Sequence, residues 1–155
     1  MASTAYLGHN AGVTSVGYLE RGTEYPQGEV SEEYIDRLVG LVKHPLLYWF
    51  GYHNCELDPC GLDQVQPERY YKGELVPNRC CTDILIPAEN LVYIAPSLIL
   101  HYILYHKYQP PACFLDAALR CPEPGSDEYI DAINRVGTPF GPFPTSRDSQ
   151  CSSET

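Results

Sequence analysis

The sequence predicts an α+β domain in which a small antiparallel sheet, a hairpin plus one or two strands, packs against three to four helices. Two observations support this class: apolar residues recur at helical spacing in several segments, and two β-rich runs flank a short linker. A chain of 155 residues suits one domain. We expect this domain to span residues 1–137 and a disordered tail, rich in serine and proline, to span residues 138–155.

The first thirty residues contain many glycines, which predicts irregular chain with a short strand at residues 13–18. The first helix begins after Ser31, a residue type that caps helices, and two glutamates follow in its first turn. Pro45 ends this helix. Its apolar residues recur at helical spacing and are Ile35, Leu38, Val39 and Val42.

The aromatic-rich run at residues 46–53 predicts a strand, and residues 54–82 are expected to be mostly loop. The next two runs, residues 83–87 and 91–95, are apolar and joined by three residues, which indicates a hairpin.

Three further helices are expected after the hairpin. Pro96 suits the first position of a helix, and residues 97–108 are apolar nearly all round, which is typical of a buried helix. A second helix, between two pairs of prolines, has an apolar stripe that includes Phe114 and Cys121. A third begins after Ser126 and ends at Gly137.

The formal net charge of -10 argues against nucleic acid and against an anionic membrane surface as partners, because both attract basic proteins. The sharper expectation is a basic protein partner; the oligomeric state stays open. Residues 1–20 lack the basic start and apolar run of a signal peptide, so we expect a cytoplasmic protein. In that reducing compartment the seven cysteines are expected to be metal ligands or buried thiols rather than disulfides.

One segment combines metal-binding residue types at close spacing. His53, Cys55 and Cys60 lie within eight residues directly after the predicted strand, and imidazole and thiolate are the ligands of tetrahedral zinc sites. The proline and glycine that flank Cys60 suit the tight turn of a zinc-knuckle-like element. We therefore expect one zinc ion here, with a fourth ligand from elsewhere in the chain.

His101, in the predicted buried helix, is the candidate for that fourth ligand, because a buried imidazole needs a polar partner. Cys80 or Cys81 could also be a ligand, and in that case it would replace His53. His106 lies 140° around a straight helix from His101, which argues against one site that contains both.

The first functional hypothesis is a structural zinc site in a protein interaction module. The second is a metal-dependent hydrolase with an open zinc position and Glu56 or Asp58 as base, and the third is a thiol-based redox sensor. The sequence contains no phosphate-binding glycine loop, no HExxH, no GxSxG and no CxxC motif. It thus predicts a metal site but neither a catalytic residue nor an organic cofactor.

Three stretches resemble a group of small uncharacterised bacterial proteins: residues 17–38, 53–60 and 86–122. That group has a short HxCxxC-like element followed by a YxAPxLIxHYIxxHxYxPP run. The resemblance implies that Cys55, Cys60 and His101 belong to one centre and carries over no activity. This chain has four residues between Cys55 and Cys60 where the group is expected to have two, which puts His53 in question as a ligand.

Overall fold

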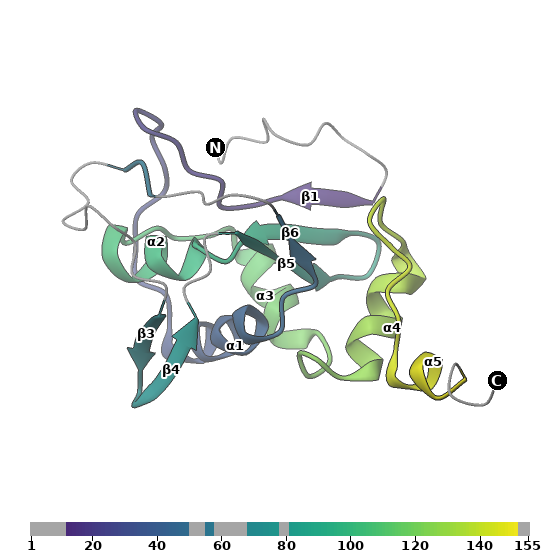
Figure 1. Ribbon diagram of the computed structural model, residues 1–155. Helices are drawn as coiled ribbons and strands as arrows, with labels where there is room; N and C mark the ends of the chain where they lie inside the picture. The colour runs from purple at the N-terminus through teal and green to yellow at the C-terminus, as the bar shows by residue number, and fades with distance from the viewer. Residues whose placement is uncertain (1–11, 50–54, 58–67, 78–80, 152–155) are drawn as a thin grey trace.

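A four-stranded sheet forms the centre of the fold (Figure 1). The computed structural model describes residues 12–49, 55–57, 68–77 and 81–151. In the sheet the strands lie in the order β1-β6-β5-β2, and their bounds are Val13–Ser15 for β1, Leu47–Tyr48 for β2, Thr82–Pro87 for β5 and Val92–Pro96 for β6. Every residue of β5 and β6 is buried. Those two strands therefore form the centre of the hydrophobic core, against which helices pack.

The β5–β6 hairpin is confirmed, with Asp83 opposite Pro96 and Pro87 opposite Val92. The sheet is nevertheless mixed rather than antiparallel, because β1 runs parallel to β6. A parallel pair needs a long connection, and the 76 residues between Ser15 and Val92 supply it. The predicted strand at residues 46–53 is short: β2 contains only Leu47 and Tyr48, and residues 50–54 lie outside the described part.

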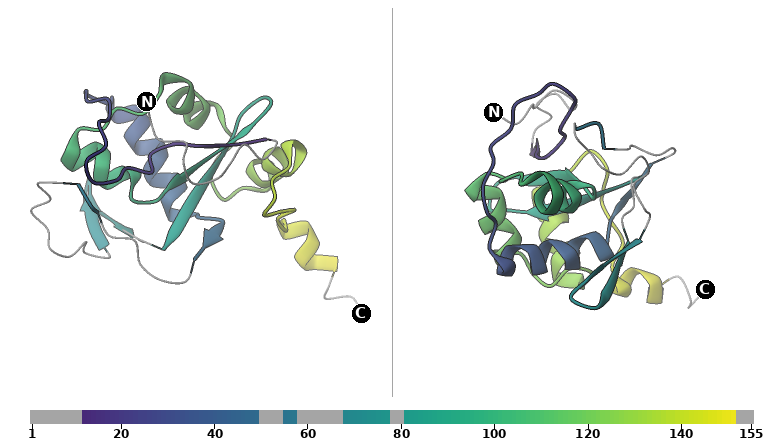
Figure 2. Two further views of the ribbon diagram at one scale, coloured as in Figure 1. Left: turned by 90° about the horizontal axis from the view of Figure 1, so that it is seen from above. Right: turned by 90° about the vertical axis from the view of Figure 1, so that its left-hand side faces the viewer.

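Helix α1 (Glu32–Lys43) and helix α3 (Ala112–Arg120) both contact β5 and each other. Figure 2 shows them together on one side of the sheet. The predicted stripe of α1 is buried, as are Phe114 and Ala118 of α3. Ser31 stands at the N-cap of α1 as expected, although its side chain makes no capping hydrogen bond.

Helix α2 (Ile99–His106) differs in two ways from the predicted buried helix. Pro96 is the last residue of β6 rather than the first of the helix, because the strand continues through it. The helix is also not buried all round: the side chains of Leu104 and Tyr105 are 44% and 56% exposed. An apolar composition therefore did not distinguish the covered face from the outer face.

A second, two-stranded sheet formed by β3 (Glu68–Tyr71) and β4 (Glu74–Pro77) lies in the segment expected to be mostly loop. Its two-residue turn, Lys72-Gly73, has positive φ at both residues, as a type I′ hairpin requires. Val76 is buried, and Lys43 of α1 pairs with Glu74 at 2.6 Å. The hairpin is thus attached to α1 through both apolar and charged contacts.

Helix α4 (Asp127–Val136) begins as predicted, with the Ser126 hydroxyl oxygen accepting from the Tyr129 amide. Beyond Gly137, where disorder was expected, the chain hydrogen-bonds back to α4. The Asn134 side chain binds both backbone groups of Phe143 at 2.9 Å, and Ser146 begins a short helix, α5 (Ser146–Cys151). The position of the domain boundary stays a prediction.

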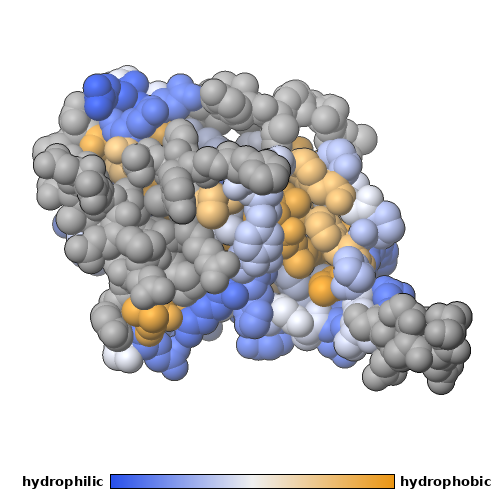
Figure 3. All heavy atoms as spheres, in the orientation of Figure 1, coloured by the Kyte–Doolittle hydropathy of each residue, from blue (hydrophilic) through white to orange (hydrophobic). Residues whose placement is uncertain are grey.

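Figure 3 shows the face of Figure 1 as atoms: apolar residues are exposed right of centre, between the sheet and α4, next to hydrophilic residues. In the described parts of the chain, no helix has the length and apolar character needed to cross a membrane.

Candidate metal centre

Three ligand-type side chains converge where the segment of residues 55–57 meets the end of α2. They are Cys55, His101 and His106, and one possible ligand atom from each lies within 4.8 Å of the other two. Cys55 Sγ is 3.3 Å from His106 Nε2. The rings of the two histidines meet edge to face, with centroids 5.1 Å apart.

The segment that carries Cys55 is held by its two neighbours. Leu57 is 5% exposed and packs in the hydrophobic core, while the carbonyl oxygen of Glu56 accepts a hydrogen bond from Arg21 Nε at 3.3 Å. Cys55 itself is half-buried and packs against the same core. These contacts direct the thiol toward α2.

The carboxyl end of α2 is held by residues 25–28. Lys107 adopts the left-handed conformation with φ 54°, which ends the helix directly after His106. The Tyr25 hydroxyl donates to the His106 carbonyl at 3.2 Å, and Gly28 N donates to the Lys107 carbonyl at 3.0 Å. His106 is therefore fixed at a helix end and is not part of a freely fraying turn.

Aromatic rings surround the histidines. The side chain of His101 is only 3% exposed, and Tyr105 stacks on it with centroids 5.1 Å apart and planes inclined by 24°. Burial lowers the pKa of His106, which favours its neutral imidazole form. Neutral imidazole is the form that coordinates metals.

The spacing of these atoms suits a tetrahedral metal. With bond lengths of about 2.3 Å to sulfur and about 2.0–2.1 Å to nitrogen, two ligands of one zinc ion lie about 3.5 Å apart. The separation of 3.3 Å between Cys55 and His106 is close to that value. The largest separation in the cluster, up to 4.8 Å, requires small side-chain rotations. The arrangement can therefore offer one sulfur and two nitrogens to a single ion.

Two of the four expected ligands, Cys55 and His101, meet in this cluster. His53 and Cys60 lie outside the described residues, as do Cys80, Asp58 and most of the expected zinc-knuckle-like element. Cys81 is described and half-buried just before β5, and it is not a member of the cluster.

The helical-angle argument against one site with both His101 and His106 does not hold, because the two rings lie side by side. The argument placed the two histidines by their angle on a straight helix, but an imidazole reaches several ångströms from its helix axis. His101 and His106 are about 1.4 turns apart, and their rings still touch. In the sequence, both histidines fall on letters of the YxAPxLIxHYIxxHxYxPP run of the group that the chain resembles, and this motif stays a prediction.

Comparison with known proteins gives one match. A family model described as "Domain of unknown function (DUF7919)" matches residues 1–119, which include all three residues of the cluster. No curated protein and no solved structure shows significant similarity to the chain. The expectation of an uncharacterised family agrees with this match, whereas the specific motif and the bacterial origin stay predictions.

Proposed function

The chain belongs to the DUF7919 family of domains of unknown function, and we propose that this domain binds one zinc ion through Cys55, His101 and His106. The observation that carries the proposal is the convergence of one sulfur and two imidazoles from two distant segments. Cys55 and His106 are separated by 51 positions in the sequence, so the fold brings them together and not their closeness along the chain.

The donor set favours zinc over the other common metals. Calcium and magnesium prefer oxygen ligands, and none of the three residues offers a carboxylate. Thiolate together with imidazole is typical of zinc, which accepts tetrahedral geometry without preference from d electrons.

A structural role follows from where the ligands lie. Cys55 belongs to the connection between β2 and β3, and both histidines belong to α2. A metal that joins them would cross-link the connection to a core helix and contribute its binding energy to folding. We further propose that Cys60 or His53 supplies the fourth ligand and closes the site, because both lie within five residues of Cys55.

Zinc binding by single-site variants tests this proposal. We expect the purified full chain to bind one zinc ion in equilibrium with a chelator of known affinity. Cys55→Ser, His101→Gln and His106→Gln should each weaken binding by about 10- to 100-fold or more, because each removes a direct ligand. The matched controls are Cys113→Ser and His44→Gln, which change exposed residues outside the cluster.

The fourth position separates a structural site from a catalytic one. In a closed site, either Cys60→Ser or His53→Gln weakens zinc binding, whereas an open hydrolytic site keeps water there and neither substitution matters. If zinc binds to the wild type but both variants bind it equally well, the closed structural site is contradicted. If the Cys55 and His106 variants bind zinc like the wild type, the cluster is not the site at all.

The proposed setting is a bacterial cytoplasm and the proposed partner is a basic protein, since the net charge is -10. In that setting the zinc-stabilised connection would present a fixed surface to the partner.

A further inference from the structure

A second feature lies away from the metal centre, in a groove of about 620 Å³ between α3, α4 and the β5–β6 turn. Its walls include Arg120 from the end of α3 and Arg135 from the end of α4. Apolar side chains, among them Ala88 and Ala117, and the ring of Tyr93 form part of its lining. The groove therefore places two guanidinium groups beside an apolar surface.

Both arginines lack a partner among the described residues: neither has a hydrogen bond or an ion pair there. Most other described cations are engaged. Arg147 binds both carboxylate oxygens of Asp131 at 2.6 and 2.7 Å, and Lys43 and Lys72 pair with carboxylates around α1. Both side chains are exposed, so their guanidinium groups are open to a ligand, although the chain has twice as many acidic as basic residues.

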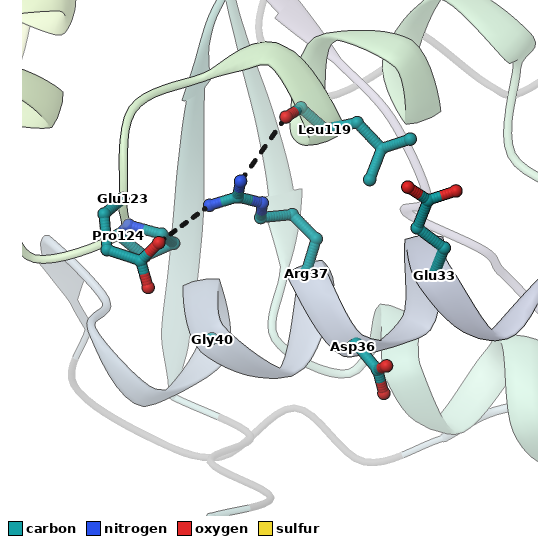
Figure 4. Close-up of a pocket in the computed structure, with 7 residues that line it drawn as sticks. All are labelled: Glu33, Asp36, Arg37, Gly40, Leu119, Glu123 and Pro124. Carbon is teal, nitrogen blue, oxygen red and sulfur yellow. Dashed lines mark hydrogen bonds and ion pairs between the residues drawn. The ribbon is translucent and has the colours of Figure 1, made fainter.

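In a neighbouring groove, by contrast, an arginine has both hydrogen-bond and ion-pair partners within the protein (Figure 4). There Arg37 of α1 donates to the carbonyl of Leu119 and pairs with Glu123, both at 3.4 Å. Its guanidinium thus joins α1 to the end of α3 and the α3–α4 connection, and its contacts are with groups of the protein itself. No such contact holds Arg120 or Arg135 in the described structure.

The carboxylates that line the groove do not neutralise the two arginines. Asp116 accepts a hydrogen bond from the Tyr34 hydroxyl at 3.3 Å, and Glu89 lies exposed near the β5–β6 turn. Neither is within ion-pair distance of Arg120 or Arg135. A favourable contact of each arginine with its own helix dipole explains a cation at each helix end, but not why both line one groove.

We propose that this groove binds a small ligand that carries a phosphate group, with Arg120 and Arg135 as its anion-binding residues. Phosphate esters carry a charge of about −1.5 to −2 at pH 7, which matches two guanidinium groups, and arginine presents paired donors to phosphate oxygens. The apolar wall then contacts the organic part of the ligand. This site is independent of the metal centre.

Nuclear magnetic resonance of the full chain, with phenyl phosphate as the probe, tests the proposal. At constant ionic strength we expect a saturable shift of the Arg120 and Arg135 Nε–Hε resonances, and none of the Arg147 resonance. Phenol, which lacks the phosphate, should cause no such shift. Arg120→Gln and Arg135→Gln should each weaken binding by about tenfold or more, because each removes a charged pair of donors.

The matched control is Arg147→Gln, which removes an arginine outside the groove and should leave phenyl phosphate binding unchanged. Arg120→Lys separates binding from helix stability, because lysine keeps the charge at the helix end but lacks the planar fork of donors. It should keep the thermal midpoint and weaken binding. Absence of a saturable shift in the wild type, or binding by Arg120→Gln and Arg135→Gln as tight as that of the wild type, would overturn the proposal.

Discussion

The chemistry of each cysteine depends on its surroundings. Cys113 is exposed on α3, while Cys121 is buried and donates from its Sγ to the Ala118 carbonyl at 3.2 Å. Burial raises the pKa of Cys121, which disfavours its reactive thiolate. Cys55 lies between these extremes and next to two imidazoles. The three thiols are therefore expected to differ in reactivity.

Labelling of the native protein with iodoacetamide, followed by mass spectrometry, checks this difference. Cys113 should react first because it is exposed, and Cys121 only on unfolding, because burial both covers its thiol and raises the pKa of that thiol. Added zinc should slow the labelling of Cys55 and leave that of Cys113 unchanged. Equal rates at Cys55 with and without zinc would argue against its role as a ligand.

At the residue scale, local signals in the sequence selected two members of the cluster. Close spacing of thiol and imidazole groups selected Cys55, and expected burial selected His101, which is buried and lies beside Cys55; that both bind a metal stays a prediction. Sequence reasoning missed His106 because the angle between two helix positions says little about the reach of long side chains. It also could not show that α2 ends directly after His106, since the contacts that end it come from residues 25–28.

At the scale of elements, the β3–β4 hairpin shows apolar and charged attachment side by side. Val76 is buried against the core, whereas Lys72 pairs with Glu32 and Asp36 at the surface. The glutamate and aspartate pairs are exposed to water, which weakens their attraction. Burial of Val76 is therefore expected to hold the hairpin in place.

Two substitutions compare how much the burial of Val76 and the ion pairs of Lys72 contribute to the free energy of unfolding. Val76→Ala should lower the free energy of unfolding by about 1.5–2 kcal/mol, because it removes two buried methyl groups. Lys72→Met should leave the urea midpoint nearly unchanged. Urea unfolding of both variants gives the comparison, and a larger loss for Lys72→Met would show that the surface charges dominate.

The attachment of α5 to α4 is expected to depend on pH. Hydrogen bonds from the Ser146 hydroxyl and amide lower the pKa of Asp127 below its ordinary value of 3.8. Because the pKa of Asp127 is lower in the folded state, the contact contributes its full stability at pH values above 3.8, the ordinary pKa of the carboxyl. This stability is lost as the pH falls through the lowered pKa of the folded state.

Titration of the Asp127 carboxyl by nuclear magnetic resonance checks this contact. Ser146→Ala removes the hydroxyl donor and should raise the pKa of Asp127 toward 3.8. An unchanged pKa in the variant would show that α5 does not dock on α4 in solution. Such a result would favour the disordered tail that the serine- and proline-rich composition predicts.

At the scale of the whole molecule, the α+β class and the central hairpin were predictable because each depends on neighbouring residues. The mixed sheet was not, since β1 has three residues and pairs with a strand far along the chain. A local sequence pattern does not show which distant strand a segment pairs with. The type I′ turn at Lys72-Gly73 is likewise recognised only once the two strands that it joins are known.

The zinc site that we propose would link a core helix to a long connection, so zinc is expected to stabilise the whole fold. Removal of zinc with a chelator should lower the thermal midpoint of the wild type, and added zinc should restore it. Cys55→Ser should show the lower midpoint with and without zinc. The same midpoint in the wild type before and after chelation would mean that the ion, if bound, is not structural.

X-ray absorption at the zinc edge of the loaded full-length chain tests the metal centre most directly. The proposed closed site predicts a four-coordinate ion with at least one sulfur, from Cys55, at about 2.3 Å and at least two imidazole nitrogens at about 2.0–2.1 Å. The sulfur contribution should fall in Cys55→Ser and stay unchanged in Cys113→Ser. A shell of nitrogen and oxygen alone, or a spectrum that Cys55→Ser leaves unchanged, would contradict the proposed site.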